Sequence, residues 1–437
     1  MQDDVGRIDV TVIGSGLAGM AACIHLSKAG LQVLCIDADP TDTDPVGESL
    51  DWSAPDLLKV LGLPMEHLLE RGIATYKRHV VFKLRDGSEQ HYVPGEWLGK
   101  PPFNIDLRTL HVDRSQLDRA VRENFLQHGV KLVHDKVVQV ETVGRAVTAV
   151  VTASSARIAS RWFIDASGAG TSLFPRLFCS PVSEYGPRKV AMWDHFTVPE
   201  SIEGTTLHAD GDGPQYMEWI WQIPIHPNTI SVGYVSPGGA VKEKRQRGLS
   251  IQEIFRSQLA RFPELQGLVD GAVETSPRTT SFRCRVFDKI VGPNWLVVGE
   301  AAAMVDPMTS NGVTAALRHA TEASKLIARY RDRRCLPSLP TAMYRRRVVS
   351  LAKFFNDGIE KVIYDWPIRN RIGAFHAGDV YTIPAWSVNV IYSRMRPQGF
   401  VATTLFRLLL ASMRFALSIF FWFCRRSQLS SPVCATS

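Results

Sequence analysis

Three glycines and one acid near the start of the chain have the types and spacing needed to hold a phosphate-containing ligand. Gly14, Gly16 and Gly19 match the pattern G-x-G-x-x-G, and Asp37 follows 23 residues after the first glycine. In this pattern the first glycine permits a tight turn, the second lets the backbone approach a pyrophosphate, and the third lets a helix pack on a strand. A carboxylate at the Asp37 position can accept hydrogen bonds from a ribose. The motif therefore predicts a dinucleotide site, and by itself it does not distinguish FAD from NAD.

The segments around these residues form a strand, a helix and a second strand. Residues 8–13 are an apolar, β-branched run, residues 17–29 are rich in alanine and stop at Gly30, and residues 33–36 are a second apolar run. The predicted helix begins directly after the glycine turn, so that its positive end faces the phosphates. We therefore expect an α/β fold with a Rossmann-type domain.

A second set of candidate residues lies in two stretches where alternating residues are typical of β-strands. Trp219 and Trp221 are two apart and so share one face of a predicted strand. Residues 76–84 also read as one strand, with Lys77 and Lys83 on the same face. An amine that is partly buried has a lowered pKa, which suits it to chemistry near neutral pH. The alternative to a chemical role for the lysines is that both lie on the solvated face of a strand. The alternative for the tryptophans is that they form an ordinary aromatic stripe facing the core.

The composition limits the class of protein. A chain of 437 residues with 45% hydrophobic content can bury a large core in one elaborate domain or in two to three intertwined ones. Its seven cysteines are scattered and include no C-x-x-C, so we expect reduced thiols, no metal site and a cytoplasmic location. The acidic start of the sequence predicts no signal peptide. We expect no nucleic-acid partner.

The C-terminal part differs in charge from the rest. From Lys325 onward there are 18 Lys and Arg residues against 5 Asp and Glu, whereas the whole chain carries a net charge of only +7. Residues 403–426 are almost all apolar, and Arg407, Arg414 and Arg425 fall on one narrow stripe of a helix. We therefore expect an amphipathic helix that lies in a membrane interface and gives peripheral membrane association. A helix that covers the substrate pocket and a true membrane span are the alternatives.

Taken together, these segments resemble the flavoprotein monooxygenase superfamily of the p-hydroxybenzoate hydroxylase type and, within it, the flavin-dependent halogenases. The resemblance spans roughly residues 6–330. Its most specific part is Trp219–Pro224, which reads W-x-W-x-I-P and is a halogenase marker. The other matching segments are Gly14–Gly19, Gly47-Glu48-Ser49, Asp165-Ala166-Ser167-Gly168, Gly299-Glu300 and Asp306-Pro307 with Gly312.

The resemblance implies that the cofactor is FAD. In the family, a Gly-Asp pair at the position of Gly299-Glu300 meets the ribityl chain, and Arg114 matches an arginine near the pyrophosphate. No second G-x-G-x-x-G is present, so reduction by NAD(P)H that docks directly or by a partner flavin reductase is expected. The implied cofactor-binding residues are Gly14, Gly16, Leu17, Ala18, Gly19, Asp37, Glu48, Ser49, Arg114, Asp165, Gly299, Glu300, Pro307, Gly312 and Val313.

The resemblance also implies the reaction. Reduced flavin, O₂ and a halide give hypohalous acid, which a lysine relays to an aromatic, lipophilic or carrier-bound substrate. Lys77 and Lys83 are the candidate catalytic lysines, and Trp219 and Trp221 would form a wall that keeps the substrate away from the flavin. Two alternatives on the same scaffold are an aromatic hydroxylase or epoxidase and a reductase of isoprenoid double bonds similar to geranylgeranyl reductases.

The expected domain organisation interleaves cofactor and substrate segments. Residues 75–105 are expected to contribute to the substrate side. The remaining assignments are residues 1–187 and 284–338 for the FAD-binding domain, residues 188–283 for a β-sheet substrate domain, and residues 339–437 for a helical C-terminal region that contains the helix 403–426.

Overall fold

A computed structural model gives the fold of the chain in two compact units. One unit comprises Met1–Asp210 with Glu218–Asp357, and the other comprises Gly211–Met217 with Gly358–Ser437. The structure describes residues 8–39, 45–96, 99–100, 107–199, 202–209, 216–271, 276–366, 369–370 and 373, together with positions 408, 412, 415 and 419.

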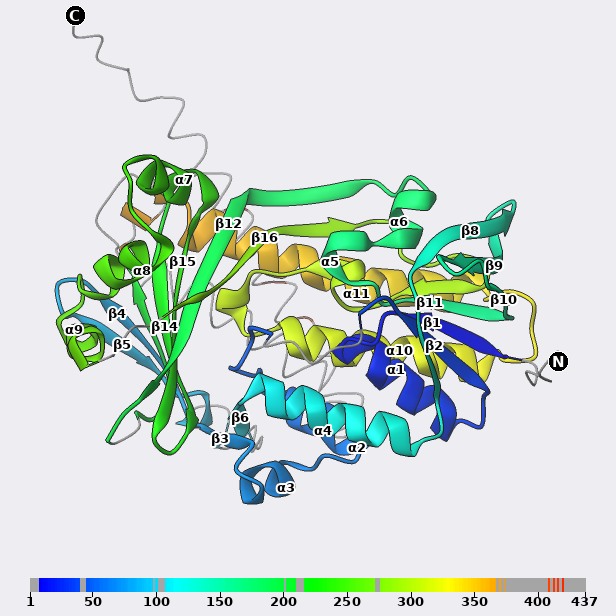
Figure 1. The fold of residues 1–437 in the computed structure, drawn as a ribbon, viewed down its shortest axis with the longest axis horizontal. Coiled ribbons are helices and arrows are strands. Elements are labelled where there is room, and N and C mark those ends of the chain that lie inside the picture. Colours follow the sequence, from blue (N-terminus) through cyan, green and yellow to red (C-terminus); the bar gives the residue numbers. More distant parts are fainter. Residues whose placement is uncertain are drawn as a thin grey trace, which may run out of the picture. The chain divides into compact units, whose positions relative to one another are not determined.

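A parallel five-stranded sheet forms the first half of the larger unit (Figure 1). Its central strands are apolar on both faces, as parallel strands covered by helices on both sides must be. This sheet confirms the expected Rossmann-type α/β fold. Its strand order is β17 (Trp295–Val297), β11 (Trp162–Asp165), β1 (Val10–Ile13), β2 (Val33–Asp37) and β7 (Lys131–His134).

Helix α1 (Leu17–Lys28) follows β1 and is buried along nearly its whole length. Helix α10 (Gly312–Arg329) packs directly against it, and Figure 1 shows the two side by side. Helix α4 (Arg114–Gln127) packs on α1 as well. Two segments that are almost 300 residues apart in the sequence therefore meet, and both helices begin at the predicted cofactor site.

A mixed eight-stranded sheet forms the other half of the larger unit. One of its faces packs against helices α7 (Gly238–Gln246), α8 (Ile251–Leu259) and α9 (Pro263–Gly271), burying Ile220, Tyr234 and Phe255 among other apolar side chains. Its strand order is β18 (Ala303–Met304), β16 (Arg278–Phe287), β12 (Val182–Thr197), β15 (Thr229–Pro237), β14 (Trp219–His226), β13 (Thr205–Ala209), β4 (Val80–Leu84) and β5 (Glu89–Tyr92).

The expectation that residues 76–84 form one strand is wrong. The chain makes two strands, β3 (Ala74–Lys77) and β4, with Arg78 and His79 between them. Strand β3 pairs with β6 (Thr109–Val112) in a small separate sheet, whereas β4 pairs with β13 and β5. Lys77 and Lys83 therefore belong to different sheets, because each strand finds its partners in distant parts of the sequence.

The remaining elements connect these layers or extend them. Strands β8 (Val137–Val143), β9 (Ala146–Thr152) and β10 (Arg157–Ala159) form a three-stranded sheet. The connecting helices are α2 (Ala54–Val60), α3 (Met65–Glu70), α5 (Gly168–Thr171), α6 (Leu173–Leu177) and α11 (Ser338–Gly358), with short turns η1 (Pro94–Glu96), η2 (Gly299–Ala301) and η3 (Pro307–Thr309).

The smaller unit contains a π-helical turn, η4 (Ile359–Ile363). Tyr216 stacks on Tyr364 with ring centroids 4.4 Å apart, and its hydroxyl donates to Glu360. Most of the predicted amphipathic helix 403–426 lies outside the described residues. Within it, Leu408, Ser412, Phe415 and Ile419 are helical and exposed. Over the described ranges, no helix is both long and apolar enough to cross a membrane.

Candidate cofactor and substrate site

The turn between β1 and α1 uses its three glycines in different ways. Gly14 has φ +101°, and a side chain there would collide with the carbonyl of Ala166. A side chain at Gly19 would collide with the carbonyl of Gly14. A Cβ at Gly16, by contrast, would meet no atom within 4 Å. The outer two glycines thus allow close packing, and the middle one leaves the backbone open to a ligand.

The start of α1 offers free backbone donors on that open side. Its N-cap is Gly16, which provides no side-chain cap for the N–H groups of the first turn, including Leu17 and Ala18. Asp37 Oδ2 accepts from the N–H of Ser15, and Asp37 Oδ1 accepts from the N–H of Asp39 at 2.9 Å. The hydroxyl of Ser15 is buried and has no hydrogen-bond partner among the described residues. These groups fit a pyrophosphate at the helix N-terminus with the carboxylate of Asp37 beside it.

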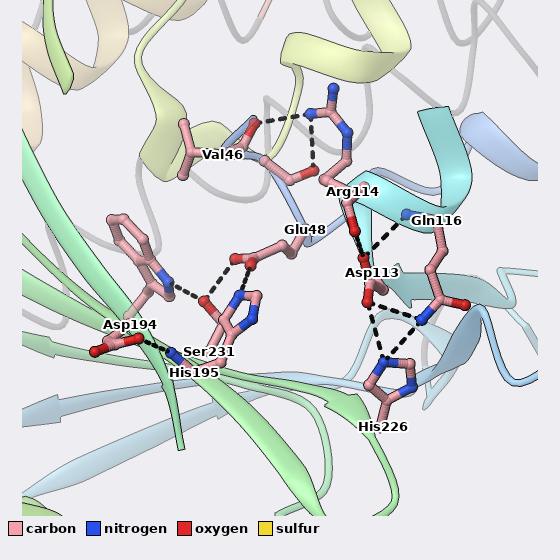
Figure 2. Close-up of polar contacts among 12 residues, drawn as sticks. Val46, Glu48, Asp113, Arg114, Gln116, Asp194, His195, His226 and Ser231 are labelled. Atoms are coloured by element: carbon pink, nitrogen blue, oxygen red, sulfur yellow. Dashed lines mark hydrogen bonds and ion pairs between the residues drawn. The ribbon is translucent and has the colours of Figure 1, made fainter. Parts of the chain in front are cut away.

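Arg114 anchors the segment that carries the Gly47-Glu48-Ser49 motif (Figure 2). Its Nη1 donates to the carbonyl of Val46 at 2.7 Å, and its Nη2 pairs with Asp118 at 3.1 Å. Gly47 has φ +114°, and a Cβ at this position would lie 2.8 Å from Arg114 Nη1 and 3.9 Å from Val313 Cγ2. The arginine, the motif and the start of α10 therefore converge.

Glu48 directs its carboxylate toward the eight-stranded sheet, as Figure 2 shows. Glu48 Oε2 accepts from the hydroxyl of Ser231 at 2.7 Å, and Glu48 Oε1 lies 2.8 Å from His195 Nε2. Ser231 Oγ in turn accepts from the indole N–H of Trp221 at 3.1 Å. The motif that sequence reasoning assigned to the cofactor is thus tied to the tryptophan face of the sheet.

The tip of the β14–β15 hairpin is tied to the start of α4 (Figure 2). His226 Nε2 lies 3.1 Å from Asp113 Oδ2, and Asp113 Oδ1 caps α4 by accepting from the N–H of Gln116. The hydrogen bond from His226 lowers the pKa of Asp113, and the carboxylate raises the pKa of His226. The residue before Arg114 therefore connects the cofactor side to the sheet.

The loop that leads into α10 is fixed by a buried ion pair. Lys189 Nζ lies 2.7 Å from Asp306 Oδ2, and both side chains are almost fully buried. Asp306 Oδ1 also accepts from the N–H of Met308, which shapes the turn η3 that begins at Pro307. Helix α10 then starts at Gly312 without a side-chain cap, so its first N–H groups are available to a ligand.

The acids at the ends of the central strands differ in environment. Asp165 at the end of β11 is fully buried and accepts from Ser167 and from the N–H of Phe174, and burial raises its pKa. Glu300 is exposed to solvent, yet desolvation by the surrounding protein raises its pKa, while the charges of Arg114 and Arg285 lower it. Asp165 therefore holds the local backbone, whereas Glu300 has its carboxylate available to a ligand.

The two candidate lysines lie in contrasting surroundings. Lys77 is 4% exposed, its Nζ donates to the carbonyl of Leu50 at 3.1 Å, and it lies 5.4 Å from the ring centroid of Trp52. Burial lowers the pKa of Lys77 to about 8. Lys83 is 30% exposed and pairs with Glu89 at 3.1 Å. The buried amine with a lowered pKa is therefore Lys77.

Trp219 and Trp221 lie next to each other on β14, both almost fully buried, with ring centroids 5.9 Å apart. They lie on the face of the strand opposite to Ile220, which packs on the helices. The ring of Trp221 crosses Gly233 of β15, where any side chain would collide with it. The tryptophans thus line the side of the sheet that also carries the Glu48 contact.

The structure brings most of the predicted cofactor residues together. Gly299 packs on Ala18, and a Cβ at Gly299 would lie 2.8 Å from the Cβ of Ala18. The open Gly16, the uncapped starts of α1 and α10, and the accessible Glu300 fit FAD. Sequence reasoning missed the residues that hold this site, for which no local motif exists: Lys189, His195, His226 and Ser231.

Comparison with known proteins agrees with this geometry. A family model described as tryptophan halogenase matches residues 107–350, more than half of the chain, and one described as lycopene cyclase protein matches residues 9–190. Among curated proteins, the flavin-dependent halogenase armH5 of Armillaria mellea is 28% identical over 73% of this chain and 64% of its own length. The chain therefore spans just under two thirds of that relative.

A bacterial relative and two solved structures extend the comparison. The 1H-pyrrole-2-carbonyl-[peptidyl-carrier protein] brominase of Pseudoalteromonas luteoviolacea is 29% identical over 73% of this chain and 77% of its own length. The flavin-dependent brominase Bmp2 shares the fold with a TM-score of 0.69 at 22% identity, covering 95% of this chain and 99% of that one. The flavin-dependent halogenase CmlS gives 0.71 at 21% identity, covering 93% and 78%.

These findings confirm the resemblance drawn from the motifs. They support an FAD-dependent oxidoreductase, and they favour halogenation over the hydroxylase and isoprenoid-reductase alternatives. The chain belongs to the tryptophan halogenase family.

Proposed function

We propose that this protein halogenates an aromatic substrate with hypohalous acid, and that Lys77 is its catalytic lysine. The observation that supports this assignment is the burial of Lys77 beside Trp52, with its amine donating to the carbonyl of Leu50, which follows the Gly47-Glu48-Ser49 motif. Lys83 does not share this setting, because it is engaged with Glu89 at the edge of the sheet. When bound and reduced, FAD supplies the electrons with which O₂ and a halide ion give hypohalous acid.

The environment of Lys77 suits it to handle that oxidant. With a pKa lowered to about 8, both the ammonium and the free amine are present at mildly alkaline pH. The ammonium can donate a hydrogen bond to the oxygen of hypohalous acid, which makes the halogen more electrophilic. The carbonyl of Leu50 holds the amine in place, since Lys77 Nζ donates to it at 3.1 Å. Because the amine is held in place, it can keep hypohalous acid near the substrate instead of letting it diffuse away.

Trp219 and Trp221 are proposed to form the wall between the cofactor and the substrate. The ring of Trp221 lies over Gly233 and is held by the Trp221–Ser231–Glu48 hydrogen bonds, and the ring of Trp219 lies 5.9 Å from it between centroids. A rigid aromatic wall excludes water and keeps a bulky arene away from the flavin, so that only the small oxidant passes. The Glu48 contact ties this wall to the cofactor segment.

We propose an aromatic substrate that is free or bound to a carrier protein. Support for the carrier-bound form comes from the pyrrole-carbonyl carrier brominase and from a second relative, the corresponding chlorinase of Pseudomonas fluorescens, which is 25% identical. The two forms are separated by offering the same pyrrole-2-carbonyl group as a free acid and as a carrier-protein thioester. Turnover of the thioester alone would identify the carrier protein as a partner.

Reducing equivalents are proposed to come from a separate flavin reductase. Support comes from the sequence, which has one G-x-G-x-x-G and no second one for a nicotinamide. The purified protein with FAD and NADH, or with FAD and NADPH, should reduce flavin slowly. Addition of a flavin reductase should start halide-dependent turnover. Rapid reduction by the protein alone would show instead that NAD(P)H docks directly.

The test of the catalytic lysine uses two matched substitutions. Lys77→Met should abolish halogenation of an electron-rich arene such as phloroglucinol while FAD binding is retained. Lys83→Met removes the other amine and should leave halogenation within about threefold of wild type. Loss of activity in Lys83→Met with normal activity in Lys77→Met would reverse the assignment. A wild-type protein that hydroxylates the arene without incorporating halide would refute the halogenase function itself.

A further inference from the structure

Four side chains form a continuous hydrogen-bond chain in the larger unit, three of them buried and the fourth, Ser310, half-buried. Ser310 Oγ donates to Ser49 Oγ at 3.2 Å, Ser49 Oγ lies 3.0 Å from Thr205 Oγ1, and Thr205 Oγ1 lies 2.8 Å from His111 Nε2. The residues come from four separate segments: the loop before α10, the Gly47-Glu48-Ser49 motif, β13 and β6. None of the local motifs requires this arrangement, so the chain is a feature of the assembled fold.

A chain that carries protons from Ser310 toward His111 requires one particular form of the histidine. Each hydroxyl carries one hydrogen, and Ser310 donates its hydrogen to Ser49. For a proton to travel on from Ser49, Ser49 must donate to Thr205, and Thr205 must donate to His111 Nε2; both bonds can be made in this direction. A neutral histidine that accepts at Nε2 carries its proton on Nδ1. Burial, together with the charges of Lys77 and His79, lowers the pKa of His111 well below its usual range and keeps it neutral.

The free end of this chain lies on the sheet face that carries the proposed catalytic lysine. Strands β3 and β6 pair with Thr75 opposite His111 and Lys77 opposite Thr109, so Lys77 and His111 lie on the same face of this sheet. His111 Nδ1 is buried, and among the described residues it has no hydrogen-bond partner. If Nδ1 carries the proton, as the path requires, this buried N–H lacks a partner at a cost of about 1–3 kcal/mol, which a partner that arrives during turnover would offset.

We propose that Ser310, Ser49, Thr205 and His111 form a proton path that returns a proton to Lys77 during turnover. This inference rests on the proposed function. When halogen is transferred, a bond forms between the halogen and the arene carbon, and the O–halogen bond of hypohalous acid breaks. The departing hydroxide takes a proton from the Lys77 ammonium and leaves as water.

The Lys77 amine must regain a proton before the next turnover. Lys77 takes a proton from His111 Nδ1, directly or through one water, and His111 Nε2 takes one from Thr205. Thr205 then takes a proton from Ser49, Ser49 takes one from Ser310, and Ser310 takes one from solvent on the side of the loop. The arene carbon then releases its own proton to His111 Nδ1, directly or through one water, and Nε2 returns a proton through the same hydroxyl groups to solvent. This restores the starting form of the path, and arene and hypohalous acid give haloarene and water with no net gain or loss of protons.

The experiment interrupts the path at Thr205. Thr205→Val keeps the shape of the side chain and removes its hydroxyl, whereas Thr205→Ser keeps a hydroxyl. Thr206→Val is the matched control, since Thr206 is the next residue of β13, is also buried and points to the opposite face. Each protein is assayed with FAD, a flavin reductase and bromide. In one assay monochlorodimedone reports released hypobromous acid. In the other, phloroglucinol serves as the arene and excess methionine removes released hypobromous acid, so that only bromination at the enzyme is counted.

We expect Thr205→Val to bind FAD and release hypobromous acid as wild type does, while bromination of phloroglucinol falls about 100-fold, the loss typical of a missing proton transfer. Thr205→Ser and Thr206→Val should retain bromination. A proton inventory in mixtures of H₂O and D₂O should be bowed for wild type and linear for Thr205→Val. Normal bromination by Thr205→Val would overturn the proton path, and so would a linear inventory for wild type.

The tautomer of His111 can also be measured in the cofactor-free protein, independently of any catalytic assay. The ¹⁵N chemical shifts of His111 should show the Nδ1–H form in wild type and a change in the Nδ1–H to Nε2–H ratio in Thr205→Val. An Nε2–H histidine in wild type would refute the path. Absence of hypobromous acid from wild type would instead refute the proposed function, so the two failures are distinguishable.

Discussion

Lys189 and Asp306 form an ion pair with a 2.7 Å separation in which neither side chain reaches solvent. The pair joins β12 of the large sheet to the loop that leads into α10. Two charges removed from water cost several kcal/mol each, and only their close contact and further hydrogen bonds offset this cost. The N–H of Met308 supplies such a bond to Asp306. This pair therefore fixes the loop to the sheet at the predicted flavin site.

Removal of one partner of this pair should be strongly destabilising. Lys189→Met leaves the Asp306 carboxylate buried without its counter-charge, and we expect a loss of about 3–5 kcal/mol in the free energy of unfolding, together with weaker FAD binding. Urea denaturation and flavin fluorescence measure the two effects. Lys353→Met is the control, because its pair with Asp288 is one-third exposed and should contribute less than about 1 kcal/mol. Equal losses in both variants would contradict the role of burial.

Replacement of Lys77 should stabilise the protein while it abolishes activity. The folded-state pKa of about 8 lies below the ordinary value of 10.5, so folding below pH 8 keeps a charge in an unfavourable site. A difference of this size corresponds to about 3 kcal/mol. Stability from this group should rise as pH increases from about 8 to 10.5, where the folded protein has released the proton and the unfolded chain has not.

The measurement compares Lys77→Met with wild type by urea denaturation at several pH values. Lys77→Met should be the more stable at pH 7, and its advantage should shrink as pH approaches 10. An advantage that does not depend on pH would show that packing, and not charge, sets the difference. This comparison also separates Lys77 from Lys83, whose exposed fraction of 30% leaves its charge in contact with water.

The Gly233→Ala substitution should disturb the tryptophan wall. The new methyl group would collide with the ring of Trp221 and force the indole away from Ser231, to which it donates at 3.1 Å. We expect a loss of about 1–3 kcal/mol and a shifted tryptophan emission. Gly239→Ala serves as the control, because a Cβ there meets no atom within 4 Å and the residue lies in α7, where alanine favours the helix by up to about 1 kcal/mol. Similar effects at both positions would contradict the contact.

The pair between His226 and Asp113 should give a pH-dependent contribution to stability. The carboxylate raises the folded-state pKa of His226 above 6.5, so its contribution is complete below pH 6.5 and is lost as pH rises through the raised value. His226→Gln should cost about 1 kcal/mol at pH 5.5 and less at pH 9. Thermal unfolding at both pH values measures the difference, with the exposed His67→Gln as control. A larger loss at pH 9 would contradict the ion pair.

Local sequence patterns are sufficient to predict the first strand, helix and second strand of the fold. The glycine turn, the alanine-rich helix and the acid after the second strand lie within 30 residues of one another, and short-range backbone constraints decide their geometry. The predicted FAD residues Gly14, Gly16 and Gly19 therefore lie at one turn, and Asp37 at the end of β2 accepts a hydrogen bond from Ser15 of that turn. The alternation that placed Trp219 and Trp221 on one face is equally local, because a strand repeats every two residues.

Contacts between distant segments explain what sequence reasoning did not find. The carboxylate of Glu48 meets His195, which lies 147 residues away, and no pattern near Glu48 signals that partner. Likewise, the strand break at Arg78 and His79 depends on β13 pairing with β4 across more than 120 residues. Periodicity alone continued the strand through this break, and so it placed two lysines on one face that the folded chain separates.

That separation has a consequence for how such a protein can diversify. Lys77 lies in a two-stranded sheet held by the motif segment, whereas Lys83 lies in the last two strands at the open end of the large sheet. Mutations that reshape β4 and β5 can therefore accumulate while the amine that we propose to handle the oxidant keeps its surroundings. The fold divides one short stretch of sequence between two sheets that can change separately.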